Sequence, residues 1–236
     1  MQNLPDLLLK IDDFNVIRGD KISGGLKQFA LEQWLPEQPF DHFIYCGTVF
    51  GYGAPALAYA GKECGKKITI FLSQSKFTPH WLNDISDISN VVVKSPSSLD
   101  MLHQDAVELQ KNLNGTSVIL TPGSYGNGFN TKMAQVCKAL VDGKHYQRMW
   151  VPVVSGTMLK VIESCFPSSE VIPVYCTKRP DYISSTSKLR FQCHKKYHQT
   201  ADVLPPYPSS HHVDAKMWSF IQEYGQKGDL VWNIAK

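Results

Sequence analysis

The chain has 236 residues, of which 43% are hydrophobic and 19% are charged, and its formal net charge is +3. This length and composition predict a globular protein of one large domain or two small lobes, and they exclude a disordered chain. The net charge is too small to predict nucleic-acid binding by itself, and without a run of about 18 apolar residues we expect no transmembrane helix.

The amino terminus and the cysteines favour a cytoplasmic protein without a membrane anchor. The chain starts without the basic and apolar regions of a secretory signal. Six cysteines are scattered among apolar segments with no Cys-x-x-Cys pair, which is typical of reduced, buried thiols. Cys193, His194 and His198 lack an evident fourth ligand, and Lys195 and Lys196 would repel a cation, so we expect no metal site.

Short apolar runs alternate with helical patterns along the first three quarters of the chain. The patterns predict an α/β fold, with mainly parallel, twisted sheets and helices on both faces. The expected strands cover residues 43–46, 68–72, 90–93, 117–120, 149–154 and 171–176, and the expected helices cover 56–64, 79–85, 99–113, 131–140 and 155–165.

The last quarter of the chain has a different composition. Residues 178–208 are rich in Ser, Thr, Pro, Lys and His, which predicts loops or a short edge hairpin, and 214–224 returns to a helical pattern. We therefore expect an α/β core over residues 1–178 with a small lobe inserted around 47–120. Residues 179–236 would supply a loop-rich segment and a C-terminal helix that complete a cleft between two lobes.

A glycine pair precedes the first helix. Gly24 and Gly25 allow the backbone to turn sharply, and Lys27 then lies in the first helical turn. The positive end of the helix dipole disfavours a protonated amine there, which suits a lysine that forms a Schiff base. The alternative is a solvated lysine on a helix surface.

Three further turns follow predicted strands, where ligands bind parallel sheets. Residues 47–53 hold three glycines, which allow close approach of a flat or anionic ligand. Ser155, Gly156 and Thr157 offer backbone N–H groups and two hydroxyls, a combination suited to phosphate. Residues 123–128 are rich enough in glycine to wrap a ligand. The alternatives are a packing turn, an ordinary N-cap at Ser155 and a flexible surface loop.

Taken in order, these segments resemble one family, the fold-type II pyridoxal-phosphate enzymes. The run R-G-D at residues 18–20 and G-G-L-K at 24–27 is similar to the R-D-D … G-G-N-K segment of the aminocyclopropane-carboxylate deaminase and D-cysteine desulfhydrase branch. The resemblance covers roughly residues 10–175. It implies a cofactor cleft between two lobes, pyridoxal 5′-phosphate as cofactor, and a homodimer.

The resemblance also implies roles for particular residues. Lys27 is the counterpart of the lysine that carries the cofactor as an aldimine. A partner for the pyridine nitrogen is expected from Ser209, Ser210, His211 or His212, with Ser209 as the candidate. The remaining cofactor contacts are Gly51, Tyr52, Ser155, Gly156 and Thr157, and the substrate contacts are Tyr125, Asn127 and Tyr207.

The chain departs from the family at the turn after the first predicted strand. The family usually offers Ser and Asn there to the substrate and the cofactor, whereas this chain has Phe50 and Gly51. Leu26 also replaces the Asn before the lysine, and the chain is shorter than typical members. A retained lysine with altered substrate residues indicates an unusual substrate or a lost activity.

The predicted function is that of a lyase, deaminase or decarboxylase dependent on pyridoxal phosphate. It would act on an amino acid or amino-acid-like group by deamination, elimination, decarboxylation or isomerisation. An aminoacyl-modified nucleotide in DNA or RNA is a second candidate substrate, because residues 188–198 interleave basic and aromatic side chains. The residues also leave open a phosphoribosyl- or phosphate-binding transferase and an inactive scaffold.

Overall fold

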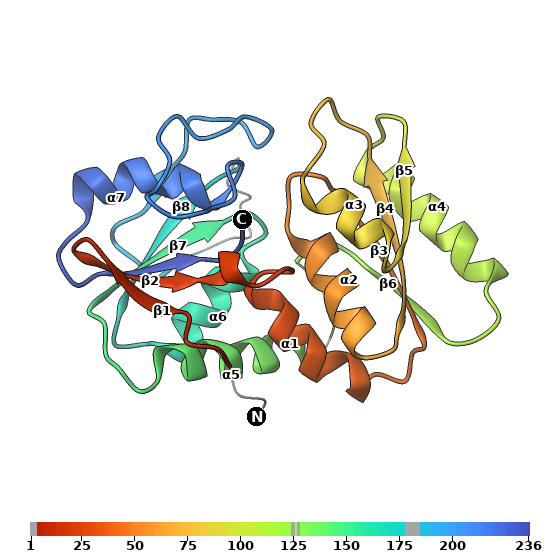
Figure 1. The fold of residues 1–236 in the computed structure, drawn as a ribbon, viewed down its shortest axis with the longest axis horizontal. Helices are drawn as coiled ribbons and strands as arrows, with labels where there is room; N and C mark the ends of the chain where they lie inside the picture. Colours follow the sequence, from red (N-terminus) through yellow and green to blue (C-terminus); the bar gives the residue numbers. More distant parts are fainter. Residues whose placement is uncertain (1–3, 124–125, 127, 178–184) are drawn as a thin grey trace. The chain divides into compact units, whose positions relative to one another are not determined.

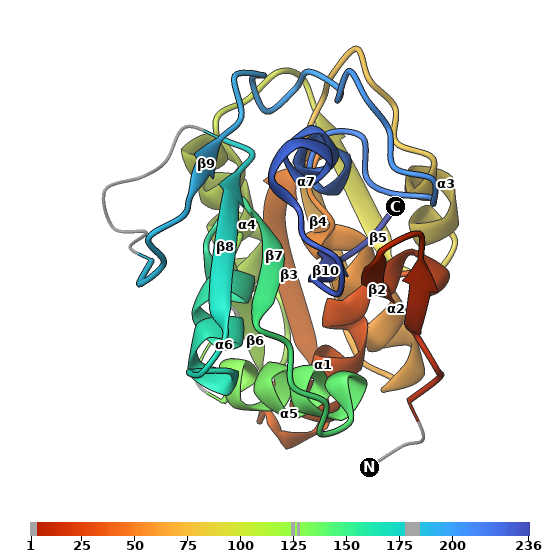
Figure 2. The ribbon, with the colours of Figure 1, turned by 90° about the vertical axis from the view of Figure 1, so that its left-hand side faces the viewer.

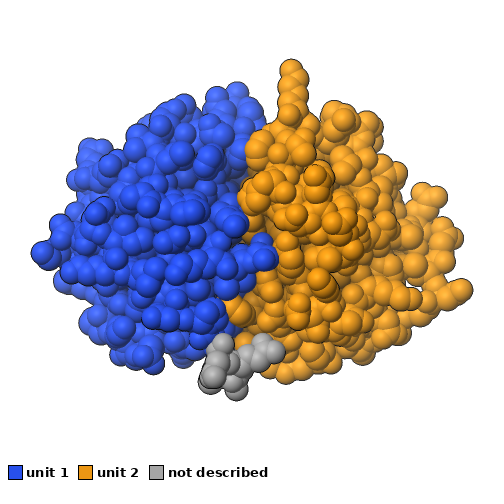
Figure 3. Space-filling view, in the orientation of Figure 1, with its two compact units in different colours: residues 1–26, 133–236 blue, residues 27–132 orange. Residues whose placement is uncertain are grey.

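The structure, a computed structural model, describes residues 4–123, 126, 128–177 and 185–236. The chain divides into two compact units, coloured separately in Figure 3. The first unit comprises residues 1–26 and 133–236, and the second comprises residues 27–132. The second unit therefore extends beyond the insertion expected around 47–120, and residues 179–236 belong to the first unit.

The first unit is built on a six-stranded sheet in the order β1-β2-β10-β7-β8-β9. Five of these strands run parallel, and β1 pairs antiparallel with β2. Figure 2 shows the sheet from β9 at one edge across β8, β7 and β10 to β2. The strands are β1 (Leu8–Ile11), β2 (Phe14–Arg18), β7 (Arg148–Val153), β8 (Glu170–Tyr175), β9 (Phe191–Gln192) and β10 (Leu230–Asn233).

Helices lie on opposite sides of this sheet. Helix α6 (Thr157–Cys165) contacts β7 and β8, and Figure 1 shows it on the side away from α7 (Trp218–Tyr224). The short helix η3 (Asp214–Met217) precedes α7 and contacts β7. Strand side chains such as Val16, Trp150 and Val231 pack with Trp218 and Ile221 of α7 in one buried cluster. The first unit also contains η1 (Gly19–Lys21) and most of α5 (Phe129–Val141).

The second unit is built on four parallel strands in the order β5-β4-β3-β6. Helices α2 and α3 cover one face and α4 covers the other, as Figure 1 shows. The strands are β3 (His42–Thr48), β4 (Lys67–Ser73), β5 (Asn90–Lys94) and β6 (Ser117–Leu120). The helices are α1 (Leu26–Trp34), η2 (Leu35–Glu37), α2 (Gly53–Glu63), α3 (Trp81–Ser86) and α4 (Leu99–Asn112).

The sequence of α4 explains both its start and its buried face. The Ser98 side chain accepts a hydrogen bond from the Met101 backbone N–H and so caps the helix. Leu102 and Ala106 stand four residues apart and pack against Ile44 of β3. The same spacing of apolar residues predicted this helix from the sequence.

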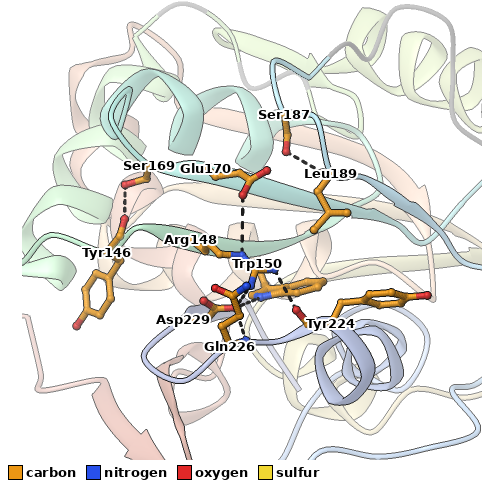
Figure 4. Close-up of polar contacts among 10 residues, drawn as sticks. All are labelled: Tyr146, Arg148, Trp150, Ser169, Glu170, Ser187, Leu189, Tyr224, Gln226 and Asp229. Carbon is orange, nitrogen blue, oxygen red and sulfur yellow. Dashed lines mark hydrogen bonds and ion pairs between the residues drawn. The ribbon is translucent and has the colours of Figure 1, made fainter.

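A buried ion pair joins the amino-terminal ends of β7 and β10 in the first unit (Figure 4). The Asp229 carboxylate lies 3.5 Å from Nη1 of Arg148 and accepts hydrogen bonds from Trp150 Nε1 at 2.7 Å and the Gln226 backbone N–H at 3.0 Å. Arg148 in turn donates to the Tyr224 carbonyl at the end of α7. These contacts fasten the α7–β10 connection to β7.

The predicted α/β fold, with mainly parallel sheets and helices on both faces, is confirmed. The hairpin expected within residues 178–208 is wrong for the part that the structure describes, because β9 pairs parallel with β8 at the sheet edge. In the described part of the chain, no helix combines the length and apolar character needed to cross a bilayer.

Candidate functional site

The first sheet has a topological switch point between β7 and β10. From β7 the chain passes through α6 to β8 on one side, whereas β10 lies on the other side of β7. The strand order reverses at this point, and open α/β sheets bind ligands at the carboxyl ends of the strands at such a point. The turn at Ser155, Gly156 and Thr157 follows β7 at this edge.

The turn after β7 places a glycine in a left-handed conformation at the start of a helix. Gly156 has a φ of 84°, in the left-handed region that favours glycine, and it occupies the N-cap of α6. The Ser155 and Thr157 hydroxyl oxygens lie 3.2 Å apart in a hydrogen bond. The first N–H groups of a helix lack intrahelical partners and carry its positive dipole end, so this turn suits a phosphate group.

Arg18, Asp20 and Asn233 form a polar network at the carboxyl ends of β2 and β10. Arg18 donates to both oxygens of Asp20, at 2.7 and 2.6 Å, and the hydrogen bond to Asp20 is the main cause of the raised pKa of Arg18. Asn233 Nδ2 donates to Asp20 Oδ1 at 2.7 Å and to the Pro208 carbonyl at 2.9 Å. The network therefore holds the segment around Pro208 at this edge of the sheet.

Tyr207 lies largely in the core next to this network. Its side chain is only 7% exposed, packs edge-on against Trp218, and has the Arg18 guanidinium 5.6 Å from its ring centre. Burial is the main cause of the raised pKa of Tyr207, and the negative charge of Asp214 raises it further. The phenol therefore stays protonated at neutral pH, and most of the ring contributes to packing.

Ser209 presents a buried hydroxyl at the same edge. The residue is 7% exposed, and its Oγ has no hydrogen-bond partner among the described residues. The next residue is fixed, because the Ser210 N–H donates to the Ala235 carbonyl at 3.1 Å. A buried hydroxyl without a partner costs about 1–3 kcal/mol, so a ligand atom that hydrogen-bonds to it would recover that energy.

Lys27 is the second residue of α1. The turn before it is held by a hydrogen bond to the residue that follows β10. The Leu26 N–H donates to the Ile234 carbonyl at 3.0 Å, and Gly25 adopts a φ of 69°, which favours glycine. Lys27 is partly buried, and the first turn of α1 contains no acidic residue. The predicted position at the positive end of a helix is confirmed.

The second sheet has its own switch point, between β3 and β6. Gly51 and Tyr52 lie in the turn after β3, which is rich in aromatic contacts. Phe50 stacks on Phe77 with ring centres 5.8 Å apart, and the Tyr52 hydroxyl hydrogen-bonds with His80 Nε2 at 3.3 Å. This turn thus presents rings in the place where the resemblance led us to expect small polar side chains.

The predicted residues are distributed over both units. The carboxyl edge of the first sheet brings together Ser155, Gly156, Thr157, Tyr207 and Ser209. Lys27, Gly51 and Tyr52 belong to the second unit. Tyr125 and Asn127 lie outside the described residues.

Sequence reasoning did not identify Asn233 and Asp214 as part of this edge. Asp214 Oδ1 accepts a hydrogen bond from the Ile234 N–H at 2.7 Å, so both residues position the chain that leaves β10. The signal that could have found Asn233 is the short apolar run of β10, which the strand predictions omitted.

The basic stretch 188–198 contains Phe191, which lies in β9. The ring of Phe191 faces the core. Phe191 stacks on Trp150 with ring centres 5.6 Å apart and also contacts Phe220 and Tyr224. This ring is therefore engaged in packing, which removes part of the reason for expecting nucleic-acid bases to stack on the stretch.

The two mainly parallel sheets and the helices that cover them give the chain a fold similar to that of solved fold-type II pyridoxal-phosphate enzymes. The chain is similar to an ACC deaminase homologue with a TM-score of 0.76 and 11% identity, over 94% of this chain and 84% of the other. It is also similar to a threonine deaminase from T.th., with a TM-score of 0.64 and 12% identity, over 94% and 86%.

A third similar structure is holo diaminopropionate ammonia lyase from Escherichia coli, with a TM-score of 0.63 and 11% identity, over 94% of this chain and 79% of the other. No protein-family model and no curated protein sequence matches the chain. The resemblance inferred from the ordered segments is therefore confirmed in the fold.

Proposed function

We propose that the chain is a pyridoxal-phosphate-dependent enzyme that acts on an amino acid or an amino-acid-like group. The observation that carries this proposal is the buried Ser209 hydroxyl, which has no partner among the described residues and lies at the same sheet edge as the anion-binding turn. These two features suit the two polar ends of the cofactor, its pyridine nitrogen and its phosphate. The fold and the ordered motifs support the same cofactor.

Each residue at this edge has a distinct role in the proposed enzyme. The N–H groups and hydroxyls around Gly156 would bind the phosphate, and Ser209 Oγ would hydrogen-bond to the pyridine nitrogen. Asn233 holds the segment that carries Ser209 through its bond to the Pro208 carbonyl. Tyr207 would face the substrate only through the exposed fraction of its ring.

Lys27 is the proposed catalytic residue. Its amine would hold the cofactor at the aldehyde group and would take and return the proton at the substrate Cα. The bound cofactor supplies an electron sink for the carbanion that proton removal leaves. The start of a helix favours the neutral amine that this role requires.

The aromatic turn after β3 supports an unusual substrate. Phe50 and Gly51 offer no side-chain hydroxyl or amide to a substrate carboxylate, and Phe50 is already stacked on Phe77. We propose that substrate contacts come from Tyr125, Asn127 and the exposed part of the Tyr207 ring, and that Gly51 and Tyr52 contact the cofactor. Deamination, elimination, decarboxylation and isomerisation all remain within the proposal, because they share the proton transfer at Cα.

The visible absorbance spectrum of the purified chain with added pyridoxal phosphate tests the proposal. We expect a cofactor band that shifts on binding and is lost in Lys27→Ala. Lys21→Ala is the matched control, because Lys21 is an exposed lysine close by in the sequence and should leave the band intact. If the wild-type chain gives no protein-dependent band with excess cofactor, the proposal is wrong.

A further inference from the structure

Two cysteines stand side by side where β8 and β9 end. Tyr175 of β8 pairs with Gln192 of β9, and the Cys193 N–H donates to the Tyr175 carbonyl at 2.9 Å. Cys176 and Cys193 therefore occupy the next position of the parallel register. Residues paired in this way project to the same face of a sheet, with backbones about 4.8 Å apart.

The two thiols differ in access. Cys176 is buried and its Sγ donates to the Val213 carbonyl at 3.2 Å, whereas Cys193 is half-buried and within reach of a small reagent. Electrostatic interaction with Cys193 contributes to the raised pKa of Cys176, although burial is the main cause. The two sulfurs are thus near enough to influence each other's charge.

A buried lysine accompanies the two thiols. Lys216 is 3% exposed, and its ammonium donates to the Lys196 carbonyl at 2.9 Å. Burial lowers the pKa of Lys216, while the charges of Cys176 and Cys193 act in the opposite direction. The positive charge of Lys216 opposes the effect of burial on the pKa of Cys176, and a thiolate is the species that attacks a disulfide.

We infer that Cys176 and Cys193 form a reversible disulfide by exchange with a small aliphatic disulfide such as oxidised glutathione. The strand spacing of about 4.8 Å lies within the Cα separation of disulfides, roughly 4.4–6.8 Å. Both cysteines directly follow the last paired residues of their strands, and the hydrogen bond from the Cys193 N–H to the Tyr175 carbonyl holds them side by side.

The disulfide forms in two successive thiol–disulfide exchange steps. The Cys193 thiolate attacks one sulfur of oxidised glutathione, which forms a mixed disulfide and releases one glutathione thiol. Cys176 then loses its proton and attacks Cys193 Sγ, which forms the intramolecular bond and releases the second glutathione. Two protein thiols are oxidised, one glutathione disulfide is reduced, and the two thiol protons end on the released glutathiones.

The Cys176–Cys193 disulfide would link the edge strand β9 covalently to β8. It would also hold the start of the segment that leads to Tyr207 and Ser209. Lys216 already attaches this segment to η3 through its bond to Lys196. The disulfide would therefore restrain the chain on which the candidate pyridine-nitrogen partner lies. The inference itself rests on the cysteines alone and stands without the proposed function.

Disulfide mapping on the full chain tests the inference. The reduced protein is equilibrated with oxidised glutathione, its remaining thiols are alkylated, and its peptides are examined by mass spectrometry. We expect a cross-linked peptide that contains Cys176 and Cys193, together with the loss of two alkylatable thiols and the return of both after reduction. Wild-type protein in which Cys193 carries glutathione while Cys176 stays alkylatable would overturn the inference, as would no modification at either cysteine.

Three serine variants sharpen the result. Cys193→Ser, at the half-buried position, should abolish the cross-link and leave Cys176 reduced. Cys176→Ser should retain one glutathione on Cys193. Cys165→Ser is the control and should leave the cross-link intact, because Cys165 lies at the end of α6, where its Sγ donates to the Ala134 carbonyl of α5. A cross-link found only between Cys137 and Cys165 would contradict the assignment.

Discussion

Asp229 is the carboxylate closest to the positive charge of the buried Arg148 in the first unit. It is 4% exposed, and it also accepts a hydrogen bond from the Trp150 indole. Glu170 lies farther from Arg148, at 3.9 Å, and is partly exposed. Because loss of the Asp229 charge would leave a buried guanidinium without its nearest carboxylate, Asp229→Asn should lower the free energy of unfolding by about 3 kcal/mol. Chemical denaturation measures this change.

The exposed ion pair between Asp13 and Lys227 provides the control for that prediction. The two side chains are 63% and 78% exposed and lie 3.4 Å apart. Water and salt screen such a pair, so Asp13→Asn should change the free energy of unfolding by less than about 1 kcal/mol. Equal effects of the two substitutions would show that burial does not set the cost of losing Asp229.

Residues that act together within one turn could be predicted from the sequence, and residues that act across the fold could not. Ser155, Gly156 and Thr157 are adjacent, and a turn after a strand is a known anion site. The bond from Asn233 to Asp20 joins residues 213 positions apart, which no local pattern reveals. The unpartnered Ser209 hydroxyl depends on burial, so only the structure distinguishes Ser209 from its neighbours.

At the level of elements, the start of α6 gives the sharpest test of the anion site. A side chain at Gly156 would be strained by about 1–2 kcal/mol, because its φ is 84°. It would also crowd the N–H groups proposed to bind phosphate. Gly156→Ala should therefore weaken binding of pyridoxal phosphate by at least about tenfold, or 1.4 kcal/mol, as measured by absorbance titration.

Gly143→Ala is the matched control for the α6 prediction. Gly143 has a φ of 69°, and a Cβ there would meet nothing within 4 Å. Its substitution should cost similar backbone strain but leave cofactor affinity unchanged, because Gly143 precedes the amino-terminal end of β7. Similar losses of affinity in both variants would indicate that strain, rather than the loss of an anion site, is responsible.

Strands with long apolar runs were predicted within one or two residues of their observed ends, for example β7 and β8. Such strands are buried on both faces of a parallel sheet, so their sequence is continuously apolar. The predictions omitted β1, β2 and β10. Strand β10 has only four residues, and its pairing with β2 depends on a partner more than two hundred positions away. Tertiary pairing, rather than local pattern, makes these segments strands.

At the scale of the whole molecule, each unit contains a histidine whose pKa is lowered mainly by burial. In the second unit this is His42, which hydrogen-bonds to Thr69, and the charge of Lys67 lowers its pKa further. In the first unit it is His212, whose pKa the charge of Lys216 also lowers. Both imidazoles therefore take up a proton less readily in the folded chain than in the unfolded chain.

Unequal proton uptake predicts a loss of stability in mild acid. As the pH falls through about 6.5, the ordinary histidine pKa, the unfolded chain binds protons first, so the free energy of unfolding decreases. Denaturation across a pH series should show this slope, and His42→Gln and His212→Gln should each reduce it. Identical slopes in the wild type and both variants would contradict the assignment to these two histidines.

Covalent trapping of the cofactor identifies the lysine that binds it. The protein is incubated with pyridoxal phosphate, reduced with borohydride, digested, and analysed by mass spectrometry for a pyridoxyl-modified lysine. We expect a single dominant modification, at Lys27. It should be absent from Lys27→Ala and should still be found at Lys27 in Lys21→Ala. Dominant modification of a different lysine, or equal labelling of Lys27→Ala, would contradict it.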